Sequence, residues 1–145
     1  MDLHIFGLSK ILAHIPEKST YLIRIFSSGY EYQEQQFPLQ ASENWREIKK
    51  YIFDDNDYHF RLGSMSIDDT IATKIVSEFA VHKDSVESLV VHCSRGKNRS
   101  PAVAMALNEL FNLGHDPHIL LAQYAEFNRL VYDNVKSAGK KLILR

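Results

Sequence analysis

The sequence predicts an α/β fold with a central, mostly parallel four-stranded sheet flanked by helices. Short apolar runs alternate with stretches in which apolar residues recur with a helical period. In addition, the apolar run Ser88–Val91 leads directly into "HCSRGKNRS", a polar segment with one glycine, and then into a helical pattern. The chain has 145 residues, of which 45% are hydrophobic, so it can bury a core, and we expect one domain over residues 1–145.

Four apolar runs have the length and composition of strands. Each is short and rich in β-branched, leucine or aromatic residues, as buried strands of a parallel sheet are. Residues 27–44, which are rich in Gln, Ser and Glu, predict no definite element. The expected strands are Leu3–Phe6, Tyr21–Phe26, Ile48–Phe53 and Leu89–His92.

A helix between the last two strands is predicted by an apolar residue at every fourth position. Ile67, Ile71, Ile75 and Phe79 form this stripe, which would lie on the sheet. We expect Ser66 to cap the helix, and the Asp69 carboxylate to lie near its positive end.

The second half of the chain predicts three more helices. The first follows the polar segment and ends at Gly114. The next begins with Asp116 as its cap and Pro117 as its first residue, and a last one covers Asn134–Leu142. The apolar face of the first consists of Ala102, Val103, Ala106, Leu107, Leu110 and Phe111, and that of the second of Leu120, Tyr124, Phe127 and Val131.

The composition argues against several classes of protein. The 17 Lys and Arg residues nearly balance the 18 Asp and Glu, so we expect no general affinity for nucleic acid. Cys93, the one cysteine, cannot form an internal disulfide, and no paired Cys or His spacing indicates a metal site. The N-terminus has neither the basic nor the long apolar region of a signal peptide, and no apolar stretch has the length of a membrane span. We therefore expect a cytoplasmic protein without a membrane span.

The segment "HCSRGKNRS" has the features of an oxyanion-binding loop. A loop between the carboxyl end of a strand and a helix directs backbone N–H groups and the helix dipole toward one point. Gly96 allows the tight curl of the backbone, and Arg99 offers a planar fork of donors that matches two phosphate oxygens. The same field favours the thiolate form of Cys93. A lone cysteine is more often a small buried hydrophobe, but this spacing favours a nucleophile.

This loop resembles the signature of the cysteine-dependent protein tyrosine and dual-specificity phosphatases. The resemblance rests on His-Cys, five residues, then Arg-Ser, with glycine third after the cysteine. The order of strands and helices, together with "FDD" after the third strand, is similar to that of small bacterial predicted tyrosine phosphatases. The resemblance implies that a phosphate-binding loop, formed by Ser94, Arg95, Gly96, Lys97, Asn98 and Arg99, connects the last strand to the central helix.

In that family a cysteine thiolate attacks phosphorus, and an aspartic acid protonates the leaving oxygen and later activates water. The resemblance implies that Cys93 is the nucleophile and that Arg99 binds the transition state. It further implies that the Ser100 hydroxyl bonds the thiolate and that His92 orders the loop. No metal or other cofactor is expected, because the loop supplies the charge stabilisation.

The general acid is the least determined residue. Geometry selects a carboxyl in a loop that follows the third strand, and the similarity to the bacterial proteins favours Asp55, with Asp57 second. Asp54 points to the opposite side of the strand from Asp55. Asp68 and Asp69 rank lower, because the helix dipole already explains two carboxylates there.

The substrate remains open at this point. A phosphorylated protein or peptide is the first expectation, but Arg95 and Lys97 would also suit a phosphoinositide. Asn98 faintly resembles the corresponding residue of RNA 5′-triphosphatases in the same superfamily. A binding protein without turnover, a pseudophosphatase, is the alternative that is not an enzyme, and it would lack a working acid.

Overall fold

A computed structural model describes residues 1–29, 33–58 and 64–143. The chain alternates strands and helices in the order expected of an α/β fold, with most helices after the third strand. The elements are β1 (Asp2–Phe6), α1 (Leu8–Ala13), β2 (Thr20–Phe26), α2 (Gln33–Gln36), β3 (Trp45–Ile52), α3 (Asp69–His82), the 3₁₀ turn η1 (Lys83–Ser85), β4 (Ser88–His92), α4 (Arg99–Phe111), α5 (Pro117–Gln123) and α6 (Arg129–Ile143).

The four strands form one parallel sheet in the order β1-β4-β2-β3. Every residue of β2 and β4 is buried, because these two central strands are covered on both faces. The edge strand β3 is only half-buried along most of its length. Since all strands are parallel, their carboxyl ends lie at the same edge of the sheet, which is where ligands bind in such folds.

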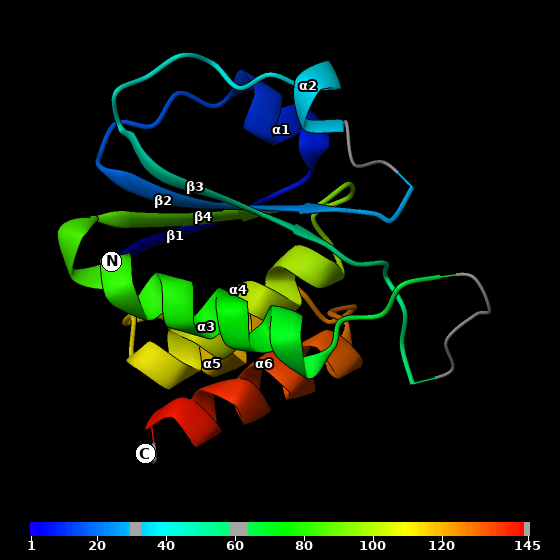
Figure 1. Ribbon diagram of the computed structural model, residues 1–145. Helices are drawn as coiled ribbons and strands as arrows, with labels where there is room; N and C mark the ends of the chain where they lie inside the picture. The colour runs from blue at the N-terminus through cyan, green and yellow to red at the C-terminus, as the bar shows by residue number, and fades with distance from the viewer. Residues whose placement is uncertain (30–32, 59–63, 144–145) are drawn as a thin grey trace.

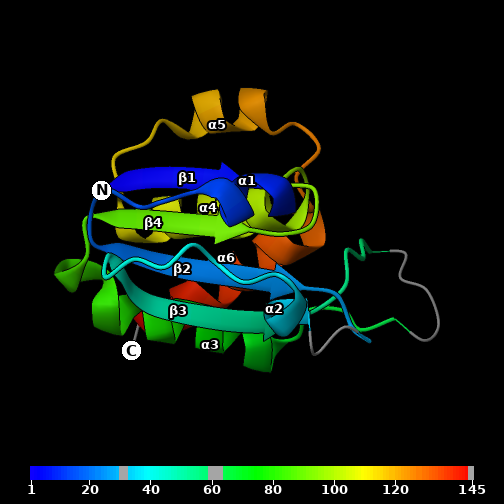
Figure 2. The same ribbon diagram turned by 90° about the horizontal axis from the view of Figure 1, so that it is seen from above.

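Helices cover the two faces of the sheet unequally. Helices α3 and α4 lie on one face, α6 packs against both of them, and α1 and α2 lie on the other face (Figures 1 and 2). The main core fills the space under the three long helices and includes Ile23, Phe79, Leu89 and Leu107. A smaller core around Ile11, Leu22 and Val90 lies under α1.

The predicted fold class is confirmed, and the strands agree closely with expectation. Three of them are at most one residue longer than predicted at the amino end. The third differs more, since β3 covers Trp45–Ile52 rather than Ile48–Phe53. Its first half contains the charged residues Arg46 and Glu47, as an edge strand allows, so an apolar run alone does not reveal where it begins.

The helix predicted from Ile67 to Phe79 forms, but Ser66 does not cap it. Asp68 is the cap, since its carboxylate accepts a hydrogen bond from Ile71 N at 2.8 Å. The Ser66 hydroxyl instead accepts a hydrogen bond from Asn56. An aspartate directly before the helix therefore takes the capping position two residues later than expected.

The boundaries of the later helices also differ from those predicted. Helix α4 ends at Phe111 because Asn112 adopts the left-handed conformation, with φ of 51°, before Gly114 is reached. Asp116 caps α5 and Pro117 starts it, as predicted. However, α5 ends at Gln123, so Tyr124 and Phe127 lie between helices, and the last helix begins at Arg129 rather than Asn134.

None of the helices described above has the length and hydropathy needed to span a membrane.

Candidate active site

The segments that follow all four strands meet around residues 93–98, which we call the cysteine loop. This loop leaves β4 and enters α4. The end of β1 supports it, since Leu8 N donates to Ser94 O at 3.0 Å and Cys93 N donates to Phe6 O at 3.3 Å. The segments after β2 and β3 reach it through Arg99. The site is therefore built at the carboxyl edge of the sheet.

The Cys93 thiol is buried, with 2% of the residue exposed. Its Sγ lies 3.1 Å from Ser100 Oγ, and Gly96 N donates to it at 3.3 Å. The sulfur also lies close to the N-terminus of α4, where the helix dipole favours negative charge. A backbone N–H, a hydroxyl and the start of a helix thus surround this sulfur.

Arg99 is almost fully buried, although it carries a charge. Its Nη1 donates to Phe53 O at 2.8 Å and to Ser27 Oγ at 3.1 Å, and its Nη2 lies 3.4 Å from Ser94 Oγ. The guanidinium therefore joins the cysteine loop to the ends of β2 and β3. Its planar donors suit an oxyanion with two accessible oxygens.

Gly96 has a positive φ of 73° and packs directly on the end of β1. A Cβ at Gly96 would lie 2.5 Å from Gly7 N and 2.7 Å from the Phe6 carbonyl carbon. A Cβ at Gly7 would likewise lie 2.9 Å from the Arg95 carbonyl oxygen. The curl of the loop thus depends on two glycines in contact, of which only Gly96 belongs to the sequence motif.

His92 lies fully buried directly before the cysteine. Burial first, and then the positive charge of Arg24, lower the pKa of His92 to about 3, so the ring is neutral near pH 7. Arg24 Nε donates to His92 Nε2 at 2.9 Å. Because Nε2 is an acceptor, the neutral ring carries its proton on Nδ1. Arg24 therefore determines the tautomer of this histidine.

Asp54 is tied into the structure by both carboxylate oxygens. Oδ1 accepts from Ser28 N at 2.9 Å, and Oδ2 accepts from Met65 N at 2.7 Å and from the Ser28 hydroxyl. Burial alone would raise the pKa of Asp54, but these hydrogen bonds and the Arg99 charge outweigh it and hold the pKa below 3.8. A carboxyl that remains ionised and fully engaged is a poor proton donor at neutral pH.

The other candidate acids have different surroundings. Asp55 is exposed, and one of its oxygens accepts a hydrogen bond from Asn128 Nδ2 at 2.8 Å. Asp57 is exposed further along the same segment. Asp68 and Asp69 lie at the start of α3, the first as its cap and the second in its first turn.

The rim of the loop carries Arg95 and Lys97, whose side chains are both exposed. Beside Lys97 is a hollow of about 220 Å³ that residues 122–126 also line. Asn98 faces the same connection, since its Nδ2 donates to Glu126 O at 2.7 Å and its O accepts from Asn128 N at 2.9 Å. This anchoring gives Asn98 a structural role.

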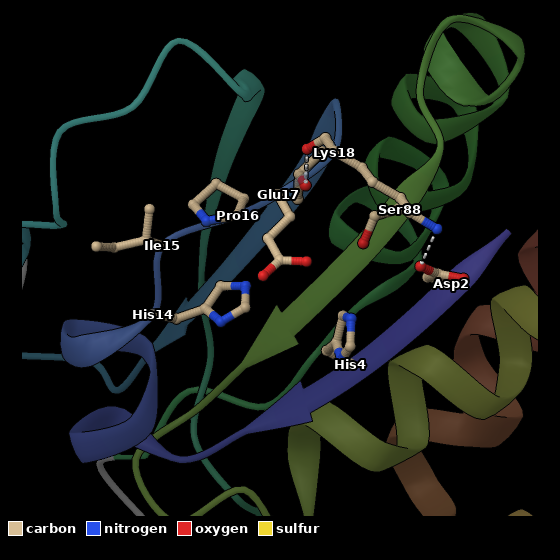
Figure 3. A pocket seen from close by; sticks show the side chains of 9 residues that line it. Asp2, His4, His14, Ile15, Pro16, Glu17, Lys18 and Ser88 are labelled. Atoms are coloured by element: carbon tan, nitrogen blue, oxygen red, sulfur yellow. Dashed lines mark hydrogen bonds and ion pairs between the residues drawn. The ribbon is translucent and has the colours of Figure 1, made fainter.

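A second hollow, of about 440 Å³, lies at the opposite ends of the strands (Figure 3). Asp2, Thr20 and Ser88, the first residues of β1, β2 and β4, help to line it. His4 and His14 also line the hollow, and the centroids of their rings are 5.7 Å apart. No residue of the cysteine loop lines it. Within the described ranges, no three His, Cys, Asp or Glu side chains are arranged to hold a metal ion.

Solved structures with a similar fold include protein tyrosine and dual-specificity phosphatases. Human DUSP28 has a TM-score of 0.58 at 12% identity, covering 98% of this chain and 94% of its own. PTPMT1 has a TM-score of 0.52 at 14% identity, with coverage of 99% and 93%. PTPMT1 in complex with PI(5)P has 0.50 at 14%, with coverage of 87% and 80%.

The chain has the fold of this phosphatase superfamily. No protein-family model matches the sequence, and the search of curated proteins finds no match either. In this phosphatase fold the structure brings together the predicted residues Cys93, Ser94, Gly96, Arg99 and Ser100. It places Arg95 and Lys97 at the rim and His92 behind the loop.

Four residues of this site were not predicted from the sequence. Gly7 follows an apolar strand, which could have drawn attention to it as a position of close backbone approach. Arg24 was detectable as the one charge in the buried run "YLIRIF". Ser27 and Asn128 carry no local signal, because their role depends on partners far away in the chain.

Replacing Asp54 with Ala should lower the free energy of unfolding by roughly 0.5–1.5 kcal/mol at pH 7, because the half-buried Ser28 and the Met65 N–H lose their acceptor. The lowered pKa of Asp54 adds stability above about pH 4, and this contribution is lost as the pH falls through the folded-state pKa. Urea denaturation of the wild type and of Asp54→Ala should therefore show a difference in the free energy of unfolding that becomes smaller below pH 4. A difference that stays the same down to pH 2 would contradict this account.

Proposed function

We propose that this chain is a phosphomonoester hydrolase of the protein tyrosine or dual-specificity type, acting through a cysteinyl-phosphate intermediate. The observation that carries the proposal is the environment of Cys93 Sγ, which Ser100 Oγ and Gly96 N contact where the cysteine loop enters α4, next to Arg99. The phosphatase fold around this loop supports the same reaction class.

In the first step the Cys93 thiolate attacks phosphorus. The sulfur–phosphorus bond forms while the bond to the alcohol oxygen breaks, and that oxygen takes a proton from Asp55. Arg99 and the loop N–H groups bind the phosphoryl oxygens as charge develops on them. In the second step the Asp55 carboxylate takes a proton from water, whose oxygen attacks phosphorus and displaces the thiolate. The Ser100 hydroxyl donates to the departing thiolate.

This chemistry requires a reduced thiol. A single buried cysteine with no disulfide partner meets this requirement in a reducing compartment, and we place the activity in the cytoplasm.

Incubation with an aryl phosphate tests the proposal. Turnover should need no added metal, should persist in EDTA and should be blocked by vanadate. Cys93→Ser should abolish turnover but still bind phosphate, whereas Arg99→Lys should weaken both, because an ammonium cannot make the bidentate contact. Activity that EDTA removes, or that Cys93→Ser retains, would refute the mechanism.

Replacing Asp55 with Asn should slow the hydrolysis of phosphotyrosine by roughly 10²–10⁴-fold, the range for loss of a general acid. An aryl phosphate with an activated leaving group should be affected far less, since its leaving oxygen needs no proton. The two substrates are compared by kcat, with Asp57→Asn and Asp68→Asn as controls. If a control variant shows this pattern instead, it carries the acid. If none does, the chain is better described as a pseudophosphatase.

Among substrates we expect phosphotyrosine in a protein or peptide to give the highest kcat/KM. A phosphoinositide is the second candidate, because Arg95 and Lys97 are exposed at the rim and PTPMT1 with bound PI(5)P is among the similar structures. RNA with a 5′-phosphate end ranks third, since Asn98 has a structural role.

Paired substitution of Arg95 and Lys97 by Ala discriminates between these substrates. For a phosphotyrosine peptide, kcat/KM should fall by no more than about fivefold, because an exposed charge pair contributes at most about 1 kcal/mol. A panel of phosphotyrosine, phosphothreonine, phosphoinositide and 5′-triphosphate RNA supplies the measurement. A larger loss confined to the inositide or the RNA would make these two residues part of substrate recognition.

A further inference from the structure

Asn128 lies directly before α6 and is almost fully buried, with 7% of the residue exposed. Every polar atom of its side chain is engaged. Oδ1 accepts from Val131 N at 3.0 Å, and Nδ2 donates to Asp55 Oδ1 and to Asn56 O, each at 2.8 Å. Because its acceptor and both donors are used, this amide restrains the positions of Asp55, Asn56 and Val131 relative to one another.

The contact with Val131 is explained by helix capping alone. The residue before a helix accepts a hydrogen bond from an N–H of the first turn, and Ser, Thr or Asp serves this purpose as well as Asn. Capping requires only the side-chain oxygen. The two hydrogen bonds that Nδ2 donates to the segment after β3 therefore need a different explanation.

The backbone around Asn128 is tied to the cysteine loop at the same time. Asn128 N donates to Asn98 O at 2.9 Å, and Asn98 Nδ2 donates to Glu126 O at 2.7 Å. Asn98 directly precedes Arg99 in the chain. One residue thus connects the segment of the candidate acid to the loop that holds the candidate nucleophile.

This arrangement meets a requirement of general acid catalysis, which is that the carboxyl lies at a fixed place relative to the phosphoryl group. Asp55 is exposed and would otherwise be free to adopt several rotamers. A donor on one carboxylate oxygen restricts the rotamer and leaves the second oxygen available to carry the proton. Asp54 differs, because both of its oxygens are occupied by Ser28 and Met65.

We infer that Asn128 is a positioning residue, whose amide holds the Asp55 carboxyl at a fixed position relative to the cysteine loop. This inference rests on the proposed function, with Asp55 as the general acid.

Asn128→Asp separates positioning from capping. The aspartate has the same shape and still caps α6, but it loses both donors and places a second carboxylate beside Asp55. We expect kcat for phosphotyrosine to fall by about 10- to 100-fold, as it does when a catalytic group is displaced, while turnover of an activated aryl phosphate falls far less. Asn128→Ser keeps a capping oxygen without the added charge, and it should show the same difference between the two substrates.

Asn134→Asp is the matched control. It makes the same change within α6, where the Asn134 amide donates to Leu130 O and, among the described residues, contacts no part of the segment after β3. This variant should lower turnover of the two substrates equally or not at all. Combining Asn128→Asp with Asp55→Asn should be no slower on phosphotyrosine than Asp55→Asn alone, because an acid that is absent cannot be misplaced.

Three outcomes would overturn the inference. The first is an equal loss on both substrates, which indicates a general structural role, and the second is a loss that adds to that of Asp55→Asn. Both would leave the proposed function intact, since turnover that depends on Cys93 would remain. The third is a wild-type protein without any such turnover, which would refute the proposed function and this inference together.

Discussion

The buried guanidinium of Arg99 connects the cysteine loop with the ends of β2 and β3, which are far apart in the sequence. A buried charge is tolerated only when it is hydrogen-bonded and has negative charge nearby. Phe53 O, Ser27 Oγ and Ser94 Oγ accept from Arg99, and the Asp54 carboxylate compensates its charge. Satisfying this one side chain thus fixes the ends of β2 and β3 against the cysteine loop. A bound phosphate would compete for the same donors, because its oxygens are stronger acceptors than a hydroxyl.

Asp54 extends this dependence to the segment before α3. By accepting from Ser28 and Met65 it holds together the chain after β2 and the chain before α3. Asp55, the next residue, then faces Asn128 at the start of α6. The adjacent carboxylates of Asp54 and Asp55 have separate partners. Asp54 can therefore stabilise the structure while Asp55 keeps one oxygen available for proton transfer.

The fold and the centre of the site were predictable because their signals are local. The run "SLVV", the glycine at the third place after the cysteine and the Arg-Ser pair lie within thirteen residues, and the physical chemistry of a strand–loop–helix connection applies to them directly. The helix boundaries were less predictable. Asp68 rather than Ser66 caps α3, and Asn112 rather than Gly114 ends α4, because neighbouring residues competed for each position.

The outer parts of the site could not be predicted in the same way. Ser27 and Asn128 are ordinary polar residues in the sequence, and their roles arise from contacts 72 and 73 positions away. Asp54 and Asp55 follow β3, which ends at Ile52, so the period of that strand does not say which of them faces Ser28 and which faces α6. That choice depends on how the helices pack over the sheet.

The contact between Gly7 and Gly96 constrains how this protein can evolve. A methyl group at either position would collide with main-chain atoms of the other segment. No substitution elsewhere can remove these atoms, because every residue has them. Genetic drift therefore cannot change one glycine first and adjust its surroundings afterwards, as it can in a core of side chains. Descendants of this sequence should keep the two glycines as a pair for as long as they keep the loop. A glycine at the end of the first strand then becomes a marker of distant kinship beyond the motif itself.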